Sequence, residues 1–170
     1  MRTISSKRGF TMIEMMVVVA IMGVVMIAAP KTFTKVFQFV QLMTARVEIQ
    51  KNARGALANI NRDLRQAQAA SLVIDSVSGQ PPHSRITFIK YNSAGALETM
   101  SYYQQGTQLF QARGGVSGKM IANNLRYIAF TYPRTDDGTI LSISLTFEKA
   151  TYEGGTKALQ MAVEKVRIMN

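Results

Sequence analysis

The sequence contains no cysteine and a single histidine, His83, among its 170 residues. Without cysteine the chain can form neither a disulfide nor an iron–sulfur cluster nor a zinc site with thiolate ligands. His83 stands in a predicted loop, residues 80–83, and has no cysteine to complete a metal site, so we interpret it as a surface residue. The fold must therefore be stabilised by packing, which a chain of this length can supply as one domain of ordinary size.

The sequence also lacks the patterns that mark catalysis. No nucleophile, general base and orienting acid converge in it, and the glycine-rich residues 114–118 lack the Lys-Ser/Thr ending of a phosphate-binding loop. Asp-Asp-Gly is first of all a turn signal, and the spacing of the nearby acidic residues does not match a calcium loop; these residues are Asp136, Asp137, Glu148 and Glu153. We therefore predict no enzymatic activity, no cofactor and no metal site.

Acidic residues are absent from the first nine positions, where Arg2, Lys7 and Arg8 stand together. The chain has 20 basic and 10 acidic residues, a net charge of +10, but the basic residues beyond this segment are scattered. Scattered charges usually belong to a solvated surface, whereas nucleic-acid binding requires a basic patch or stripe. We therefore do not expect nucleic acid as a partner.

Residues 15–30 contain no charged or strongly polar side chain. As a helix with a rise of about 1.5 Å per residue, residues 10–29 would span the roughly 30 Å of a bilayer's hydrocarbon core. A basic stretch followed by apolar residues also describes a cleaved secretory signal, and a third interpretation is a plain single-pass anchor. Composition alone leaves these three interpretations open.

Glu14 separates these interpretations, because it places a carboxylate inside the apolar run. A charge in hydrocarbon is expensive, and charged residues in membrane segments generally have a function. Neither an anchor nor a cleaved signal has a use for it. The alternative for Glu14 is a tolerated residue near the lipid headgroups, whose carboxylate reaches toward water.

Residues 7–14, K-R-G-F-T-M-I-E, together with the apolar stretch after them, resemble the leader and N-terminus of type IV prepilins and pseudopilins. The resemblance implies that prepilin peptidase cuts after Gly9 on the cytoplasmic side and methylates the new N-terminus at Phe10. It also implies that Glu14, the fifth mature residue, serves assembly with other pilin subunits, and that Pro30 is the helix-kink proline, one position earlier than usual. In lipid, the Glu14 carboxylate could pair with the Phe10 ammonium of an adjacent subunit.

The orientation of the apolar run is not set by its flanking charges, because basic residues stand on both sides: Arg2, Lys7 and Arg8 before it, and Lys31, Lys35 and Arg46 after it. Only the resemblance of the leader implies an orientation. It places the leader in the cytoplasm and the head in the periplasm, on a protein anchored in the inner membrane before it enters a pilus or pseudopilus.

Beyond Pro30, apolar residues recur at helical spacing at Val36, Val40, Met43 and Val47 and, after a break, at Ala53, Leu57, Ile60, Leu64 and Ala67. This pattern predicts a long helix with one apolar face, packed on a globular head. The opposite face carries Arg46, Glu48, Lys51, Arg54, Arg62, Asp63 and Arg65. We accordingly divide the chain into a leader at 1–9, a membrane and assembly helix at 10–30, its amphipathic continuation at 31–70 and a head at 71–170.

From residue 72 onward, strand patterns alternate with turn signals. Apolar and polar residues alternate at 128–132 and 141–148 on either side of a turn at 135–138, which predicts a hairpin. Further strands are expected at 85–91, 97–104, 108–113 and around 158–168, with turns at 92–95, 105–107 and 154–155. These elements predict a pilin-like α+β fold, in which a long N-terminal helix, its first half transmembrane, packs on a C-terminal antiparallel β-sheet meander.

Several stretches of the head resemble the J-type minor pseudopilins of type II secretion and PilW-type minor pilins: I-T-F-I-K-Y at 86–91, S-Y-Y at 101–103, L-F-Q-A-R at 109–113, N-N-L-R-Y-I-A-F-T-Y at 123–132 and the terminal V-R-I-M-N. The absence of cysteine agrees with this group, because major pilins commonly close their C-terminal region with a disulfide. The resemblance implies a minor subunit within, or at the tip of, a secretion pseudopilus or a pilus. The alternatives are a DNA-uptake pseudopilus component and a membrane-tethered binding module with a basic head.

Overall fold

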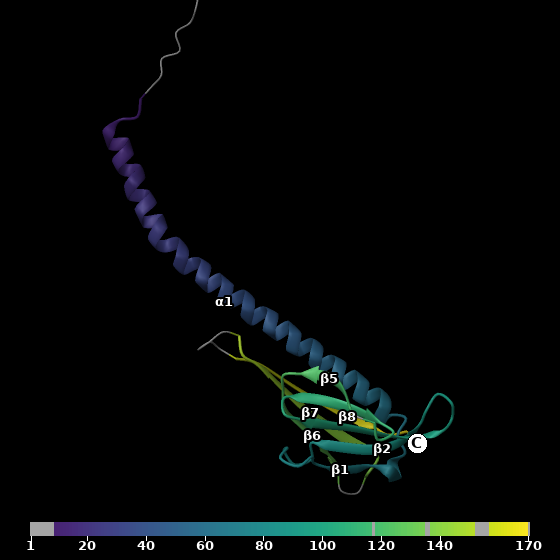
Figure 1. Ribbon diagram of the computed structural model, residues 1–170. Coiled ribbons are helices and arrows are strands. Elements are labelled where there is room, and N and C mark those ends of the chain that lie inside the picture. Colours follow the sequence, from purple (N-terminus) through teal and green to yellow (C-terminus); the bar gives the residue numbers. More distant parts are fainter. Residues whose placement is uncertain (1–8, 117, 135–136, 152–156, 170) are drawn as a thin grey trace, which may run out of the picture. The chain divides into compact units, whose positions relative to one another are not determined.

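The computed structural model describes residues 9–116, 118–134, 137–151 and 157–169. The chain forms two units, Met1–Val40 and Gln41–Asn170. One helix, α1, covers Met12–Leu64 and contributes to both units (Figure 1). The described elements that follow α1 belong to the second unit, which is the head.

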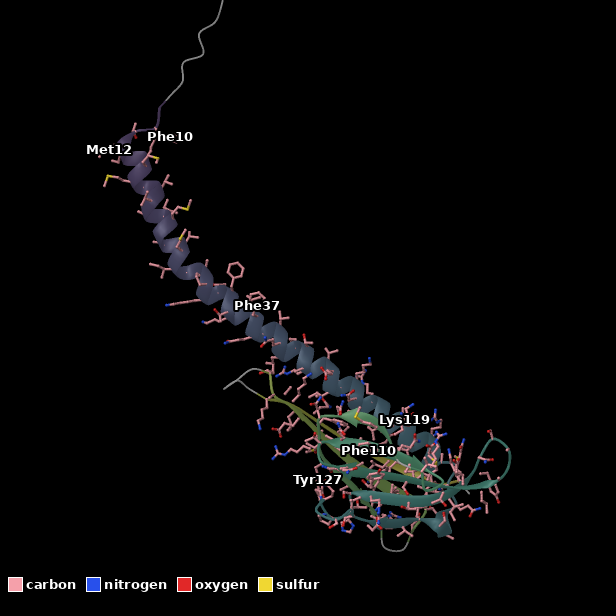
Figure 2. All side chains as sticks on the ribbon, viewed as in Figure 1. Phe10, Met12, Phe37, Phe110, Lys119 and Tyr127 are labelled. Atoms are coloured by element: carbon pink, nitrogen blue, oxygen red, sulfur yellow. The ribbon has the colours of Figure 1, made fainter. Side chains whose placement is uncertain are left out.

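The N-terminal unit consists mainly of the first part of α1, whose side chains are mostly apolar and exposed (Figure 2). Alanine, valine, isoleucine and methionine fill residues 15–29 apart from Gly23. By length and composition, α1 is the one helix of the described chain that could cross a membrane. Because so large an apolar surface is unfavourable in water, this segment needs lipid or another protein chain around it.

The second part of α1, from residue 41, buries one face in the head. The buried apolar residues follow one another at helical spacing: Ala45, Ile49, Ala53, Ala56, Ile60 and Leu64. The predicted face is confirmed at Ala53, Ile60 and Leu64, but it is wrong at Met43 and Val47, which are exposed. Val47 stands two residues from both Ala45 and Ile49, about 200° around the helix from each. The buried row alternates alanines with the larger Ile49, Ile60 and Leu64, and the alanines allow a close approach of the helix to the head.

The helix ends at Leu64, before the predicted limit at residue 70. Its last turn tightens through bonds to the third residue back, from Gln66 N to Asp63 O at 3.2 Å and from Ala67 N to Leu64 O at 3.1 Å. Ala67 then forms an isolated bridge with Lys90, and a short 3₁₀ helix, η1, follows at Ala69–Ser71. Ala67 is buried as predicted, although it lies beyond the helix.

The head contains eight strands in the described residues, arranged in two sheets with antiparallel neighbours throughout. The first sheet has the order β1-β2-β3-β4-β5 and the second the order β6-β7-β8. Their bounds are Val73–Asp75, Arg85–Tyr91, Leu97–Gln105, Gln108–Arg113 and Lys119–Asn123 for β1 to β5, and Leu125–Thr131, Ile140–Lys149 and Ala158–Arg167 for β6 to β8. The predicted α+β architecture is thus confirmed, while β1 and β5 were not predicted.

The single meander expected from the sequence is divided in two at Asn124. This residue has a positive φ of 61° between the end of β5 and the start of β6. Asparagine is one of the few residues other than glycine that adopt this conformation readily. The predicted turn at 92–95 is present, with Gly95 at φ 78° and the Asn92 side chain accepting from Ala94 N and Ala96 N. The turns predicted at 135–138 and 154–155 fall wholly or partly outside the described residues.

One hydrophobic core joins the second part of α1 to both sheets. Its largest fully buried side chains are Phe88, Tyr102, Phe130 and Phe147, and the rings of Phe88 and Tyr102 stack with their centroids 6.3 Å apart. Gln104 links the two sheets, because its Nε2 donates to Arg126 O at 3.1 Å and its Oε1 accepts from Ile128 N at 3.2 Å. The sheets are therefore parts of one packed head.

Candidate functional site

The predicted processing residues Gly9 and Phe10 lie immediately before α1, outside its first turn. Both residues are exposed, and Phe10 is exposed to 81%. Figure 2 shows the Phe10 side chain beside Met12 at the start of the helix. The peptide bond between Gly9 and Phe10 is therefore not held in helical structure.

Glu14 and Thr11 bind each other in the first turn of α1. Thr11 donates to Glu14 Oε2 from its backbone N at 2.8 Å and from its Oγ1 at 3.0 Å. Glu14 N donates in return to Thr11 Oγ1 at 3.3 Å. This reciprocal arrangement is a capping box, with Thr11 at the N-cap and Glu14 as the third helical residue, and it satisfies N–H groups that a helix start otherwise leaves free.

The capping box gives Glu14 a local role that our sequence reasoning missed. The signal was present as Thr-x-x-Glu at 11–14, directly before an apolar run. Thr11 is a neutral partner, so the capping box supplies no counter-charge to the Glu14 carboxylate. Pairing of that charge with the Phe10 ammonium of a neighbouring subunit is compatible with this geometry and stays a prediction.

Pro30 lies inside α1, which continues through it. Proline lacks the N–H that a helical residue donates to the carbonyl four positions earlier, here that of Met26. Two threonine hydroxyls bond to carbonyls in this region, Thr34 Oγ1 to Pro30 O at 2.6 Å and Thr32 Oγ1 to Ala28 O at 3.2 Å. Such bonds often accompany a helix bend. The missing N–H of Pro30 and these two threonine bonds would both favour a bend. The kink itself stays a prediction.

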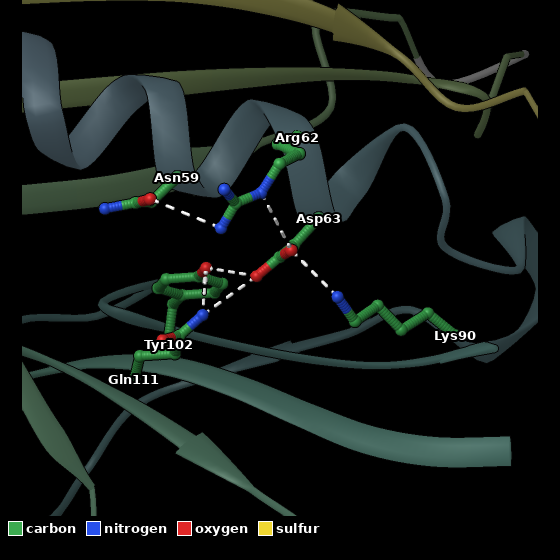
Figure 3. A network of polar contacts seen from close by, with 6 residues as sticks. All are labelled: Asn59, Arg62, Asp63, Lys90, Tyr102 and Gln111. Carbon is green, nitrogen blue, oxygen red and sulfur yellow. Dashed lines mark hydrogen bonds and ion pairs between the residues drawn. The ribbon is translucent and has the colours of Figure 1, made fainter. Parts of the chain in front are cut away.

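The head contains a buried cluster of polar side chains around Asp63, which we call the Asp63 cluster (Figure 3). Asp63 accepts hydrogen bonds from Lys90 Nζ at 2.8 Å, Tyr102 Oη at 2.6 Å and Gln111 Nε2 at 2.8 Å. Gln111 Nε2 also donates to Tyr102 Oη at 2.7 Å. Asp63 is 1% exposed and Lys90 8%. The prediction that Asp63 lies on the solvated face of the helix is therefore wrong.

The electrostatics of the Asp63 cluster are those of a satisfied ion pair. Burial by itself raises the pKa of Asp63, but the hydrogen bonds from Lys90 and Tyr102 and the positive charge of Lys90 outweigh it, so the pKa is lowered overall. Burial, together with the bond to Asp63, raises the pKa of Tyr102. At neutral pH the carboxylate is therefore charged and the phenol neutral. The cluster ties the end of α1 to β2, β3 and β4, and it presents no activated nucleophile.

His83 and the first two glycines of the glycine-rich stretch, Gly114 and Gly115, take part in turns. His83 is exposed, has a positive φ of 59° and accepts a hydrogen bond at its backbone oxygen from Phe130 N at 3.0 Å. Gly114 and Gly115, at φ 58° and 78°, begin the connection between β4 and β5. Positive φ values explain glycine at these two positions.

The acidic residues near the Asp-Asp-Gly turn bind other side chains or backbone groups, or lie outside the described residues. Glu148 forms ion pairs with Arg126 and Lys157, while Asp137 accepts from both the backbone N and the hydroxyl of Thr139. Asp136 and Glu153 are outside the described part of the chain. Within the described ranges, no group of three or more His, Cys, Asp or Glu side chains could hold a metal ion.

Residues 4–30 match the family described as the prokaryotic N-terminal methylation motif. The matched range includes the predicted cut after Gly9, Thr11, Glu14 and Pro30. No curated protein and no solved structure matches the chain. The family match therefore covers the N-terminal segment, residues 4–30.

Proposed function

We propose that this chain is a minor pseudopilin or minor pilin, which is cut after Gly9, methylated at Phe10 and assembled through α1 into, or at the tip of, a type II secretion pseudopilus or a type IV pilus. The N-terminal methylation motif at 4–30 is the observation that carries this proposal. The motif supports a subunit of the pilin or pseudopilin type. Subunits of this type are structural proteins rather than enzymes.

The structure of the N-terminal unit supports processing and membrane insertion. Gly9 and Phe10 precede the helix and are exposed, as substrates of a peptidase must be. The helix after them is apolar and long enough to cross a membrane, which is consistent with anchoring in the inner membrane before assembly. The leader would then be cytoplasmic and the head periplasmic.

The assignment to the minor subunits is supported by the head. It has no cysteine for the disulfide that commonly closes major pilins. The stretches at 86–91, 101–103 and 109–113, which resemble J-type pseudopilins and PilW-type pilins, lie in β2, β3 and β4. Because the chain carries Glu14, it would not be a tip subunit that lacks this residue. Its partners would be prepilin peptidase and other pilin-type subunits.

Mass spectrometry of the mature N-terminus tests the proposal directly. Protein isolated from the membranes and filaments of its native host should begin at N-methylated Phe10. A Gly9→Val variant, which differs only at the residue before the cut, should keep its leader and serve as the control. An intact Met1 terminus in the wild type would overturn the proposal, and a terminus at Lys31 would indicate a secretory signal instead.

A further inference from the structure

The open edges of the two sheets in the head differ in how far they are protected. An unpaired strand edge offers free N–H and C=O groups to another strand, and proteins usually keep such edges short, bulged, charged or covered. In the described chain the edge strands are β1, β5, β6 and β8. Three of them are protected in these ways, whereas β8 is charged only toward its C-terminal end.

The three protected edges each have an identifiable device. Strand β1 has only three residues, and β5 has five residues in a shifted register against β4. Strand β6 has a register shift between Leu125 and Tyr127, and its backbone is bonded on the other side, since Ile128 N donates to Gln104 Oε1 and Phe130 N to His83 O. These edges are poor templates for a further strand.

Strand β8 has none of these devices over most of its length. It contains ten residues without proline and pairs with β7 in continuous register from Ala158 opposite Lys149 to Arg167 opposite Ile140. Its second edge carries no other strand within the described residues. A long, regular and unpaired edge of this kind favours the addition of a strand from another chain.

The backbone groups on the open edge of β8 can be identified from the ladder. Ile168 N donates to Thr139 O at 2.8 Å, so Ile168 bonds toward β7. Successive residues of a strand point their backbone N–H and C=O groups to opposite sides. The even-numbered residues of β8 therefore bond to β7, and the N–H and C=O groups of the odd-numbered residues face the open edge. The carbonyl of Met161 agrees, since it accepts from the Gln160 side chain at 3.1 Å.

The same odd-numbered residues place their side chains on the outer face of the sheet. Leu159, Met161 and Val163 are exposed to 55%, 63% and 59%, and Lys165 and Arg167 follow them as exposed basic residues. We call these five residues the β8 row. Met161 lies opposite the half-buried Thr146 of β7, which in turn lies opposite the exposed Tyr127 of β6.

We propose that the β8 row binds the edge strand of a different filament subunit, one with apolar side chains at alternate positions and acidic side chains where it meets Lys165 and Arg167. Backbone hydrogen bonds to the open edge would supply affinity, and the apolar and basic parts of the row would select register and partner. The identity of the partner as a filament subunit rests on the proposed function.

A second copy of this chain is a poor occupant of the β8 row. If two copies pair antiparallel with Met161 opposite Met161, their apolar residues meet, but Lys165 falls opposite Lys157 of the other copy at both ends. If Val163 is placed opposite Val163, Lys165 falls opposite Met161 and Arg167 opposite Leu159. Like charges, or charges set against apolar groups, disfavour both registers. The chain without residues 1–9 has 17 basic and 10 acidic residues, and this net charge of +7 also opposes self-association.

The test compares full-length variants expressed in the native host and extracted in mild detergent. Val163→Pro removes an N–H on the open edge and leaves the bonds to β7 intact, while Val163→Lys places a charge in the apolar part of the row. Val73→Lys is the matched control, because Val73 is a valine of similar exposure, 56%, on the edge strand β1. The readout is the amount of other pilin-type subunits that co-purify, together with the melting temperature of each variant.

We expect both Val163 variants to lose about fivefold or more of the co-purified subunit and the Val73 variant to behave like the wild type. Wild-type recovery with Val163→Pro, or an equal loss with Val73→Lys, would overturn the role of the β8 row. The N-terminal mass is read on the same samples, so that a retained leader counts against the proposed function and not against the edge.

Discussion

At the scale of single residues, Glu14 has one observed task, capping, and one proposed task, assembly, and the structure suggests how to separate them. Its carboxylate accepts from Thr11 in the capping box, which depends on an acceptor oxygen at the third helical position. The proposed contact with a neighbouring Phe10 depends on negative charge. Glutamine serves the first task but not the second, because it can cap a helix without carrying a charge.

We therefore expect Glu14→Gln and Glu14→Ala to be cut normally after Gly9 but to enter filaments about tenfold less than the wild type. The measurement is the ratio of mature subunit in sheared filaments to that in membranes, with the N-terminus confirmed by mass spectrometry. Normal incorporation of the glutamine variant together with loss of the alanine variant would assign the role of Glu14 to capping rather than to charge pairing.

Asp63 is the residue on which the polar contacts of the head converge. Replacing it with alanine leaves Lys90 buried without a counter-charge and removes an acceptor from Tyr102 and Gln111. We expect Asp63→Ala to lower the free energy of unfolding by about 3 to 5 kcal/mol, as is usual when one partner of a buried ion pair is removed. Urea denaturation of the full chain in detergent, followed by circular dichroism, measures this.

The double variant Asp63→Ala with Lys90→Met provides the control for that prediction. It removes the buried ammonium as well as the carboxylate, and methionine retains most of the side-chain volume. We expect it to regain part of the lost stability. If the double variant is as unstable as the two single changes added together, Asp63 and Lys90 are not coupled.

At the scale of elements, the contact between α1 and the head depends on small residues. Ala53 is 2% exposed and Ala56 is 0% exposed, so a larger side chain at either position would meet the packed head. The exposed valine at position 47 shows that apolar character alone does not select the buried face. Close packing of backbone against the sheets decides it instead.

Replacing Ala56 with leucine should therefore destabilise the head by about 1 to 3 kcal/mol through overpacking. Ala58→Leu is the matched control, because Ala58 belongs to the same helix and is exposed; it should change stability by less than about 0.5 kcal/mol. Urea midpoints of the two variants give the comparison. Equal losses of stability in the two variants would show that burial of the position does not decide whether α1 accepts a larger side chain.

At the scale of the whole molecule, the carboxylates of the head make its stability dependent on pH. The pKa of Asp63 is lowered, as described above, and hydrogen bonds lower the pKa of three other carboxyl groups: from Arg85 to Asp75, from Thr139 to Asp137 and from Lys157 to Glu148. A lowered folded-state pKa means that the unfolded chain binds more protons near its own pKa of about 4. The stabilisation is therefore complete above about pH 5 and is lost as the pH falls through the lower folded-state values.

We expect the melting temperature to be nearly constant between about pH 5 and 7 and to fall below about pH 4. The Asp63→Asn variant, which has no carboxyl group to protonate at this position, should start lower and fall less steeply. Differential scanning fluorimetry in matched buffers measures both slopes. A wild-type melting temperature that is unchanged down to pH 3 would contradict the role of these carboxylates.

Much of the fold could be predicted because its signals are local. Alternation at 85–91 and 141–148 and the Asn-Ser-Ala-Gly turn at 92–95 depend only on neighbouring residues, and the structure has them where they were expected. Strand β1 was missed because three residues are too few to show a period. The division into two sheets was missed because the only local sign of it is the positive φ of Asn124, between β5 and β6, which the sequence does not show.

The sequence by itself determined the N-terminal segment of this protein: the basic residues before Gly9, the Thr-x-x-Glu signal at 11–14, and an apolar run that could cross a bilayer. These features act over a few residues, so their order along the chain is sufficient. Only the tertiary structure decided that Asp63 meets Lys90, Tyr102 and Gln111, which lie 27, 39 and 48 residues away, and that β8 keeps an open edge. Such contacts depend on which face every element buries at once, because a buried charge is tolerated only where distant partners are brought to it.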